Sequence, residues 1–243
     1  MPGRQRADVV LVERGLFESR ARAQAAIEAG LVVADGKPVL KPSETIAPDA
    51  VLRAEPAHPW VSRGGVKLAD ALERYPLDIE DRVCLDVGAS TGGFTEVLLN
   101  HGASLVHAID VGVGQLHPSL HGNPRILAQE QTDIRNLRGT RLSVRPEIVV
   151  IDVSFISLKQ VLPVALDLAA ARCSLLALIK PQFEAGRGSL KKGIVRDAAV
   201  HQAVCDDIAE VVASLGCARI KVFPSCIAGG DGNAEFFIGA HRG

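Results

Sequence analysis

Two charged residues of opposite sign each end a short apolar run. Asp152 ends the run VVID, and Lys180 ends the run LLALIK. Ligands of open α/β sheets bind beyond the carboxyl ends of the strands, so charged groups at such positions are candidates for catalysis. A lysine can accept or polarise the proton of a hydroxyl group, and a carboxylate can orient the lysine. The two residues could also form a structural ion pair, but their position favours proton handling.

A glycine-rich stretch, LDVGASTGGFT, follows another apolar run and leads into a helical segment that starts at Phe94. A helix that begins after such a loop directs N–H groups at the loop, which favours an anionic or ribose-linked ligand. The glycine spacing does not fit the dinucleotide pattern G-x-G-x-x-G, which argues against NAD. The acidic Asp86, two places before the first glycine, suits the ammonium group of S-adenosylmethionine. Without a ligand, the same stretch reads as a tight strand-to-helix turn.

Further polar residues after later apolar runs extend this predicted cofactor site. Asp110 could accept hydrogen bonds from both hydroxyls of a ribose, and Thr132 and Asp133 lie where adenine contacts are expected. We therefore predict an S-adenosylmethionine site formed by Asp86, Gly88, Ala89, Ser90, Gly92, Gly93, Phe94, Asp110, Val111, Thr132, Asp133 and Asp152.

The elements that would position these residues alternate between strands and helices from residue 83 onward. Such alternation predicts an α/β domain with a doubly wound, Rossmann-like sheet over residues 62–243. The expected strands are 83–87, 105–109, 125–128, 148–151, 175–179, 220–224 and 235–240, and the expected longer helices are 62–75, 94–101, 158–171 and 198–215.

Residues 1–56 have a different pattern, which predicts a small α+β module, and residues 57–61 (AHPWV) form a linker. We expect helices over 7–14 and 19–29, with Ser19 as N-cap, then a hairpin of 31–34 and 39–40 and a strand over 51–54. This segment resembles the small RNA-binding module named after ribosomal small-subunit protein S-four. The resemblance implies RNA binding, chiefly through Arg20 and Arg22, although charge alone favours a solvated helix face.

Composition narrows the class of protein. The formal net charge is −1, so any affinity for RNA must come from a local basic patch. No apolar run approaches the roughly 18 residues of a membrane span, and the N-terminal residues lack the apolar block of a signal peptide, so a cytoplasmic protein is expected. The five cysteines lack C-x-x-C spacing, which predicts reduced thiols and no metal site.

Six motifs together resemble the TlyA family of rRNA 2′-O-methyltransferases: SRGGVKL, LDVGASTGGFTEVLL, DVGVGQL, IDVSFISL, IKPQFE and GGDGNAEFF. The resemblance implies an S-four-type module joined to an FtsJ-like methyltransferase domain. It also implies a catalytic tetrad of Lys67, Asp152, Lys180 and Glu235, in which Lys180 activates the 2′-hydroxyl of a cytidine in large-subunit rRNA, and possible further action on small-subunit rRNA. From the sequence pattern alone, Lys67 lies off the apolar stripe of its helix and would be exposed.

The predicted RNA contacts are basic residues of both segments, namely Arg4, Arg6, Arg20, Arg22, Lys37, Arg63, Arg187, Lys191 and Lys192. The last three belong to the glycine-rich segment 184–196, which is either an RNA-gripping loop or a solvated connection. Two other classes of function stay open: a membrane-active haemolysin, and a ribosome assembly factor that binds RNA without catalysis. A cytosine C5 or adenine N6 methyltransferase is disfavoured, because neither catalytic pattern is present.

Overall fold

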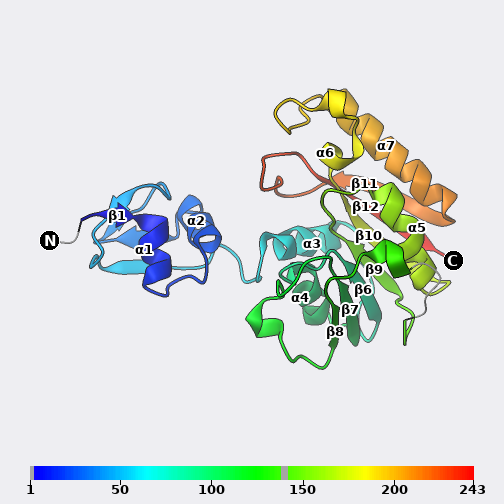
Figure 1. Cartoon of the computed structure of the whole chain (residues 1–243), viewed down its shortest axis with the longest axis horizontal. Helices are drawn as coiled ribbons and strands as arrows, with labels where there is room; N and C mark the ends of the chain where they lie inside the picture. Colours follow the sequence, from blue (N-terminus) through cyan, green and yellow to red (C-terminus); the bar gives the residue numbers. More distant parts are fainter. Residues whose placement is uncertain (1–2, 138–141) are drawn as a thin grey trace. The chain divides into compact units, whose positions relative to one another are not determined.

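The chain forms two compact units, Met1–Pro59 and Trp60–Gly243. The computed structural model describes residues 3–137 and 142–243, and within that range it leaves the side chain of Arg187 undescribed. Figure 1 shows the helices and strands of both units, coloured along the sequence.

The first unit packs two short helices against two small sheets. Ser19 caps the second helix, as predicted, because its Oγ accepts a hydrogen bond from the backbone N–H of Arg22. The predicted hairpin is present, but its second strand lies slightly earlier than expected. A strand pair near the N-terminus was not predicted, because strands of two residues show no periodicity. The elements are β1 (Gln5–Arg6), α1 (Ala7–Glu13), α2 (Arg20–Glu28), β2 (Val32–Ala34), β3 (Lys37–Pro38), β4 (Thr45–Ile46) and β5 (Leu52–Ala54), paired as β1-β4 and β3-β2-β5.

The second unit is built on a sheet whose order, among the described residues, is β11-β12-β10-β9-β6-β7-β8. The strands from β8 to β10 pair in parallel, and β12 runs antiparallel to both of its neighbours. The doubly wound sheet predicted from the sequence is confirmed; it is mostly parallel, and the antiparallel direction of β12 was not predicted. Its strands are β6 (Val83–Val87), β7 (Leu105–Ile109), β8 (Ile126–Gln129), β9 (Ile148–Ile151), β10 (Cys173–Ile179), β11 (Cys217–Pro224) and β12 (Phe236–Arg242).

Helices cover both faces of this sheet (Figure 1). One face packs against α3 (Arg63–Arg74) and α4 (Gly93–Asn100), and the other against α5 (Leu158–Leu168) and α7 (Ala198–Ser214). Each face has its own apolar core because successive strand residues point to opposite sides. The short helix α6 (Pro181–Glu184) follows β10, and single 3₁₀ turns lie at Pro118–Leu120 (η1), Ile134–Leu137 (η2) and Arg187–Ser189 (η3).

Parallel pairing brings the carboxyl ends of β6, β7, β9 and β10 to one edge of the sheet. The loops that leave this edge hold the glycine-rich stretch and the residues after each strand. The antiparallel β12 starts at the same edge, because its first residue, Phe236, pairs with the last residue of β10, Ile179. Side chains from five segments that are distant in sequence therefore meet at this edge.

Candidate functional site

Lys180 and Asp152 form an ion pair at the carboxyl ends of β10 and β9. Lys180 Nζ lies 2.6 Å from Asp152 Oδ1, and both side chains are largely buried. The geometry of this contact is not that of a hydrogen bond to Oδ1; the lysine instead donates to Ser154 Oγ at 2.9 Å. The ammonium group is thus fixed by two residues of the loop after β9. Such a group is placed to handle the proton of a bound hydroxyl.

A second ion pair joins Lys67 of α3 to Glu235, which directly precedes β12. Lys67 Nζ donates to Glu235 Oε2 at 2.5 Å, and the two side chains are 9% and 3% exposed. The exposed position that the helix pattern alone predicts for Lys67 is therefore wrong. The lysine is buried because it faces a carboxylate brought in by the hairpin before β12, a contact that helical periodicity cannot reveal.

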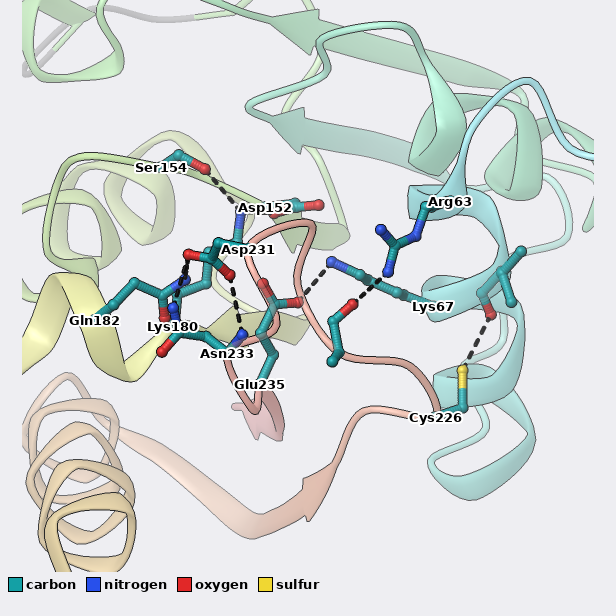
Figure 2. A network of polar contacts seen from close by, with 12 residues as sticks. Arg63, Lys67, Asp152, Ser154, Lys180, Gln182, Cys226, Asp231, Asn233 and Glu235 are labelled. Carbon is teal, nitrogen blue, oxygen red and sulfur yellow. Dashed lines mark hydrogen bonds and ion pairs between the residues drawn. The ribbon is translucent and has the colours of Figure 1, made fainter. Parts of the chain in front are cut away.

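The sheet register places the two pairs next to each other. Because Ile179 pairs with Phe236, the following Lys180 and the preceding Glu235 are neighbours across β10 and β12. Asp152 follows β9, the strand on the other side of β10. Figure 2 shows all four side chains in one network of polar contacts. The four residues that the family resemblance implies thus form one cluster, which we call the tetrad.

A cavity of about 480 Å³ opens beside the tetrad at the ends of β6, β7 and β9. Asp152 is a tetrad residue and also lines the cavity. Of the predicted cofactor contacts, the cavity is lined by Gly88, Ser90, Asp110, Val111, Thr132, Asp133 and Asp152. Its volume is within the range of small-molecule sites, and its lining combines apolar side chains with a few polar groups.

Hydrogen bonds from backbone and side-chain groups orient the carboxylates of the cavity lining. Asp110 Oδ2 accepts from the N–H of Ser90 at 2.8 Å, and its Oδ1 accepts from the N–H of Gly112 at 2.6 Å. Asp133 is held by the guanidinium of Arg135, and this hydrogen bond lowers the pKa of Asp133 below its usual range. The oxygens of both carboxylates can accept hydrogen bonds from a ligand.

Gly88 shapes the floor of the cavity for a reason internal to the fold. Its φ is +84°, and a Cβ there would lie 2.2 Å from the carbonyl oxygen of Asp152. The glycine therefore lets the loop after β6 cross the end of β9 closely, which brings the cavity and the tetrad together. The same reasoning applies to Gly93, where a Cβ would lie 2.2 Å from Ser62 Oγ at the start of α3.

Asp86 lies below the loop and not on the cavity surface. It is fully buried, its Oδ2 accepts from Thr95 Oγ1 at 2.6 Å, and its Oδ1 has no partner among the described residues. Burial raises the pKa of Asp86 to about 7. Ala89, Gly92, Gly93 and Phe94 also stand apart from the cavity lining, and Phe94 packs into the core against Phe237.

The orphaned oxygen of Asp86 and the polar lining of the cavity fit a ligand that has a cationic group and ribose hydroxyls. An unpaired buried carboxylate oxygen favours a cation or donor nearby, because leaving it unpaired is costly. The carboxylates of Asp110 and Asp133 supply acceptors for hydroxyl and amine groups. The residues present are therefore consistent with S-adenosylmethionine.

In the first unit, a buried carboxylate organises two of the predicted RNA-binding arginines. Asp8 is fully buried and accepts hydrogen bonds from Arg6, Arg20 and Gln24. The side chains of Arg6 and Arg20 are still 44% and 55% exposed. The hydrogen bond from Arg6, despite the opposing effect of burial, lowers the pKa of Asp8 well below its usual range. Asp8 thus holds both guanidinium groups at the surface.

The other predicted RNA contacts are in different surroundings. In the first unit, Arg4 donates to the carbonyl of Thr45, Arg22 lies 3.9 Å from Glu18, and Lys37 is exposed on β3. In the second unit, Arg63 donates to the carbonyl of Ala228, whereas Lys191 and Lys192 are exposed in the segment after α6. Nothing is described for the side chain of Arg187.

Several residues at the site were not predicted. Ser154 binds Lys180, Phe155 and Arg135 line the cavity, and Asp231 and Asn233 join the polar network around the tetrad. The spacing Asp152-x-Ser154 was a usable signal, because both residues lie in the loop that follows a strand. No comparable signal marked Asn233, since asparagine in a glycine-rich loop usually indicates a turn.

The chain is similar to known proteins over both units. Residues 60–242 match the model of the FtsJ-like methyltransferase family, and residues 5–52 match the S4 domain. A 16S/23S rRNA (cytidine-2′-O)-methyltransferase TlyA from Mycobacterium tuberculosis is 43% identical over 98% of this chain and 90% of its own length. Hemolysin A from Brachyspira hyodysenteriae is 34% identical over 95% of this chain and 97% of its own length.

A solved structure supports the same relationship. It is that of a candidate hemolysin from Streptococcus thermophilus, with 39% identity and a TM-score of 0.77 over 98% of this chain and 88% of the other. None of the helices within residues 3–137 and 142–243 is long and apolar enough to cross a membrane. The fold, the tetrad and these similarities agree, and the chain belongs to the TlyA family of FtsJ-like methyltransferases.

Proposed function

We propose that this enzyme uses S-adenosylmethionine to methylate the 2′-hydroxyl of a cytidine ribose in rRNA. The observation that carries the proposal is the adjacency of the tetrad to the cavity, with Asp152 belonging to both. The relative from Mycobacterium tuberculosis is named for this reaction on 16S and 23S rRNA. We propose large-subunit rRNA as the first target to examine here, and the cytoplasm as the compartment in which the enzyme meets it.

In this proposal Lys180 acts on the reacting oxygen. A ribose 2′-hydroxyl is a weak acid and must lose its proton as the new C–O bond forms, so a nearby base or donor lowers the barrier. As a neutral amine Lys180 would accept this proton, and as an ammonium it would polarise the hydroxyl oxygen, while Asp152 and Ser154 hold its Nζ in place. General-base help of this kind contributes about 10²–10⁴ in rate.

Lys67 and Glu235 would hold the ribose. The ammonium of Lys67 is restrained by Glu235, and Glu235 is the sheet neighbour of Lys180. A positively charged donor at this point can hydrogen-bond to sugar oxygens and keep the 2′-hydroxyl in line for transfer. Alignment of reacting atoms contributes as much as proton transfer or more.

The cavity would hold the cofactor. Asp110 is the proposed partner of the ribose hydroxyls, Thr132 and Asp133 are the proposed partners of the adenine, and the buried carboxyl of Asp86 lies below the glycine loop. When bound, S-adenosylmethionine supplies a methyl group activated by a sulfonium. The chain's own contribution is to bind this group, to exclude water and to position the acceptor hydroxyl.

RNA recognition would fall to the first unit and to basic residues near the tetrad. We propose residues 1–56 as the RNA-binding module, 57–61 as a linker, and 62–243 as the catalytic domain. Arg6 and Arg20, both held by Asp8, are the proposed phosphate contacts of the module. Phosphate contacts of this kind fix position on the RNA without reading its sequence.

The direct test combines the purified chain, radiolabelled S-adenosylmethionine and ribosomal subunits from cells that lack the gene. We expect label in rRNA at a 2′-O-methylcytidine that is missing from those cells. Label on a base, or none on any RNA while the cofactor binds, would overturn the proposal.

A further inference from the structure

A tight turn that contains two lysines lies in the segment that follows α6. Lys191 and Ile194 pair through two backbone hydrogen bonds, of 3.0 and 3.1 Å, and we call Lys191–Ile194 the basic turn. Its central residues Lys192 and Gly193 both have positive φ, +53° and +79°. Positive φ at both central positions is typical of a type I′ turn, which glycine adopts freely and lysine rarely.

One buried asparagine of the tetrad hairpin holds the stem of this turn. Asn233 is fully buried; its Oδ1 accepts from the N–H of Val195 at 2.9 Å, and its Nδ2 donates to the carbonyl of Gly193 at 3.0 Å. Both ends of the amide therefore bind the backbone of the segment that bears Lys191 and Lys192. A buried amide with such satisfied groups fixes its partners firmly, because losing any contact leaves a buried polar group unpaired.

The same asparagine is tied to the catalytic side through Asp231. Asn233 Nδ2 donates to Asp231 Oδ2 at 2.7 Å, and Asp231 also accepts from Gln182, two residues after Lys180, at 3.4 Å. Two residues after Asn233 comes Glu235 of the tetrad. Figure 2 shows this continuous chain of contacts from Gln182 through Asp231 to Asn233, beside Lys180 and Glu235.

We propose that Asn233 and Asp231 are positioning residues that hold the basic turn on the loop that leads to Glu235, so that its lysines contact RNA phosphates flanking the target ribose. Lys191 and Lys192 are exposed, while their backbone is fixed, which suits contact with a phosphodiester backbone. The segment is thus a held binding element and not a solvated connection. This inference rests on the proposed function and adds to it the residues that orient the acceptor strand.

The first test is Asn233→Asp, which places a carboxylate beside Asp231 and against the carbonyl of Gly193. We expect the KM for rRNA to rise about tenfold, and its dependence on salt to weaken as phosphate contacts are lost. The rate constant of methyl transfer in a single turnover should also fall. The affinity for S-adenosylmethionine should stay at the wild-type value. The double variant Asp231→Asn with Asn233→Asp restores one amide–carboxylate contact, and we expect it to recover part of the loss.

A second variant leaves every side chain of the buried network in place. Gly193→Ala adds a methyl group that meets nothing within 4 Å, but it penalises the positive φ that the turn requires. We expect a raised KM for rRNA, an unchanged cofactor affinity and only a small fall in the melting temperature. The matched control is Lys159→Ala. It removes an exposed lysine of α5 that pairs with Asp207 of α7, and it should behave as wild type.

The outcomes separate this inference from the proposed function. If the wild-type chain transfers no methyl group to rRNA, the proposed function fails. If the wild type is active and both Asn233→Asp and Gly193→Ala keep its KM and salt dependence, the positioning role is wrong. If Asn233→Asp loses only thermal stability, with KM for rRNA unchanged in the folded fraction, the asparagine serves the fold and not the RNA.

Discussion

Lys67 and Glu235 are 168 positions apart in the sequence, and the structure joins them in a buried ion pair of 2.5 Å. Lys67 lies one helical turn after Arg63, which donates to the carbonyl of Ala228 in the hairpin before β12. The first turns of α3 are thereby attached twice to the segment that supplies Glu235. The site consequently depends on contacts between the beginning and the end of the catalytic unit.

This pair leads to a double-mutant cycle. Lys67→Met or Glu235→Gln alone leaves a buried group without its partner, and we expect each to cost about 3–5 kcal/mol of stability. The combined variant removes both charges and should cost less than the sum of the two. Urea unfolding of the four proteins measures the coupling. Additive losses would show that the two groups do not interact in solution.

The tetrad lysine at the end of β10 gives a sharper prediction for activity. Lys180→Met removes the ammonium but keeps the apolar stem, so the cavity and its binding of S-adenosylmethionine should be retained. Methyl transfer should fall by at least about 10²-fold, the lower range for a lost general base. Calorimetry with the cofactor and single-turnover assays with rRNA separate the two effects. Near-normal turnover in this variant would remove Lys180 from the mechanism.

Much of the fold followed from local patterns. The strands from β6 to β10 are short apolar runs followed by polar residues, and such runs predict buried parallel strands. Local patterns identified only two of the four tetrad residues. Asp152 and Lys180 were identifiable because both end strands, whereas Lys67 and Glu235 carried no signal of their own and were named only through the family resemblance.

The remaining gaps have one physical cause, which is that long-range contacts leave little trace in local sequence. In the sequence Asp8 is one acidic residue among several arginines, but in the structure it is buried and holds two of them. The glycines of the loop after β6 suggest room for a ligand. The structure shows that Gly88 also makes room for the carbonyl of Asp152.

The arrangement around Asp8 predicts how RNA binding depends on salt. Arg20→Ala should weaken RNA binding and reduce the slope of log K against log salt by about one, because one phosphate contact is lost. Asp8→Asn keeps both arginines but weakens their orientation, so affinity should fall with a smaller change in slope. Filter binding at several salt concentrations measures both quantities. Arg53→Ala, an exposed arginine on β5 with no assigned role, is the control. If Arg20→Ala binds RNA as tightly as wild type, Arg20 is an ordinary solvated residue and not a phosphate contact.

The buried carboxyl of Asp86 predicts a stability that changes with pH in an uncommon direction. Burial raises its pKa from 3.8 to about 7, so between these values the folded state keeps a proton that the unfolded state has lost. The unfolded state then binds fewer protons, and the free energy of unfolding must fall as pH rises from about 4 to about 7. Asp86→Asn should remove this fall.

The control for that measurement has the opposite sign. The hydrogen bond from Arg135 lowers the pKa of Asp133, so this group contributes stability above its unfolded pKa and loses it as pH falls through the folded value. Asp133→Asn should therefore reduce stability at neutral pH and have little effect in acid. Urea unfolding of wild type and both variants across pH 3–8 gives the two difference curves. If the curve for Asp86→Asn parallels that of wild type, the carboxyl titrates as an ordinary aspartate and does not remain protonated below the glycine loop.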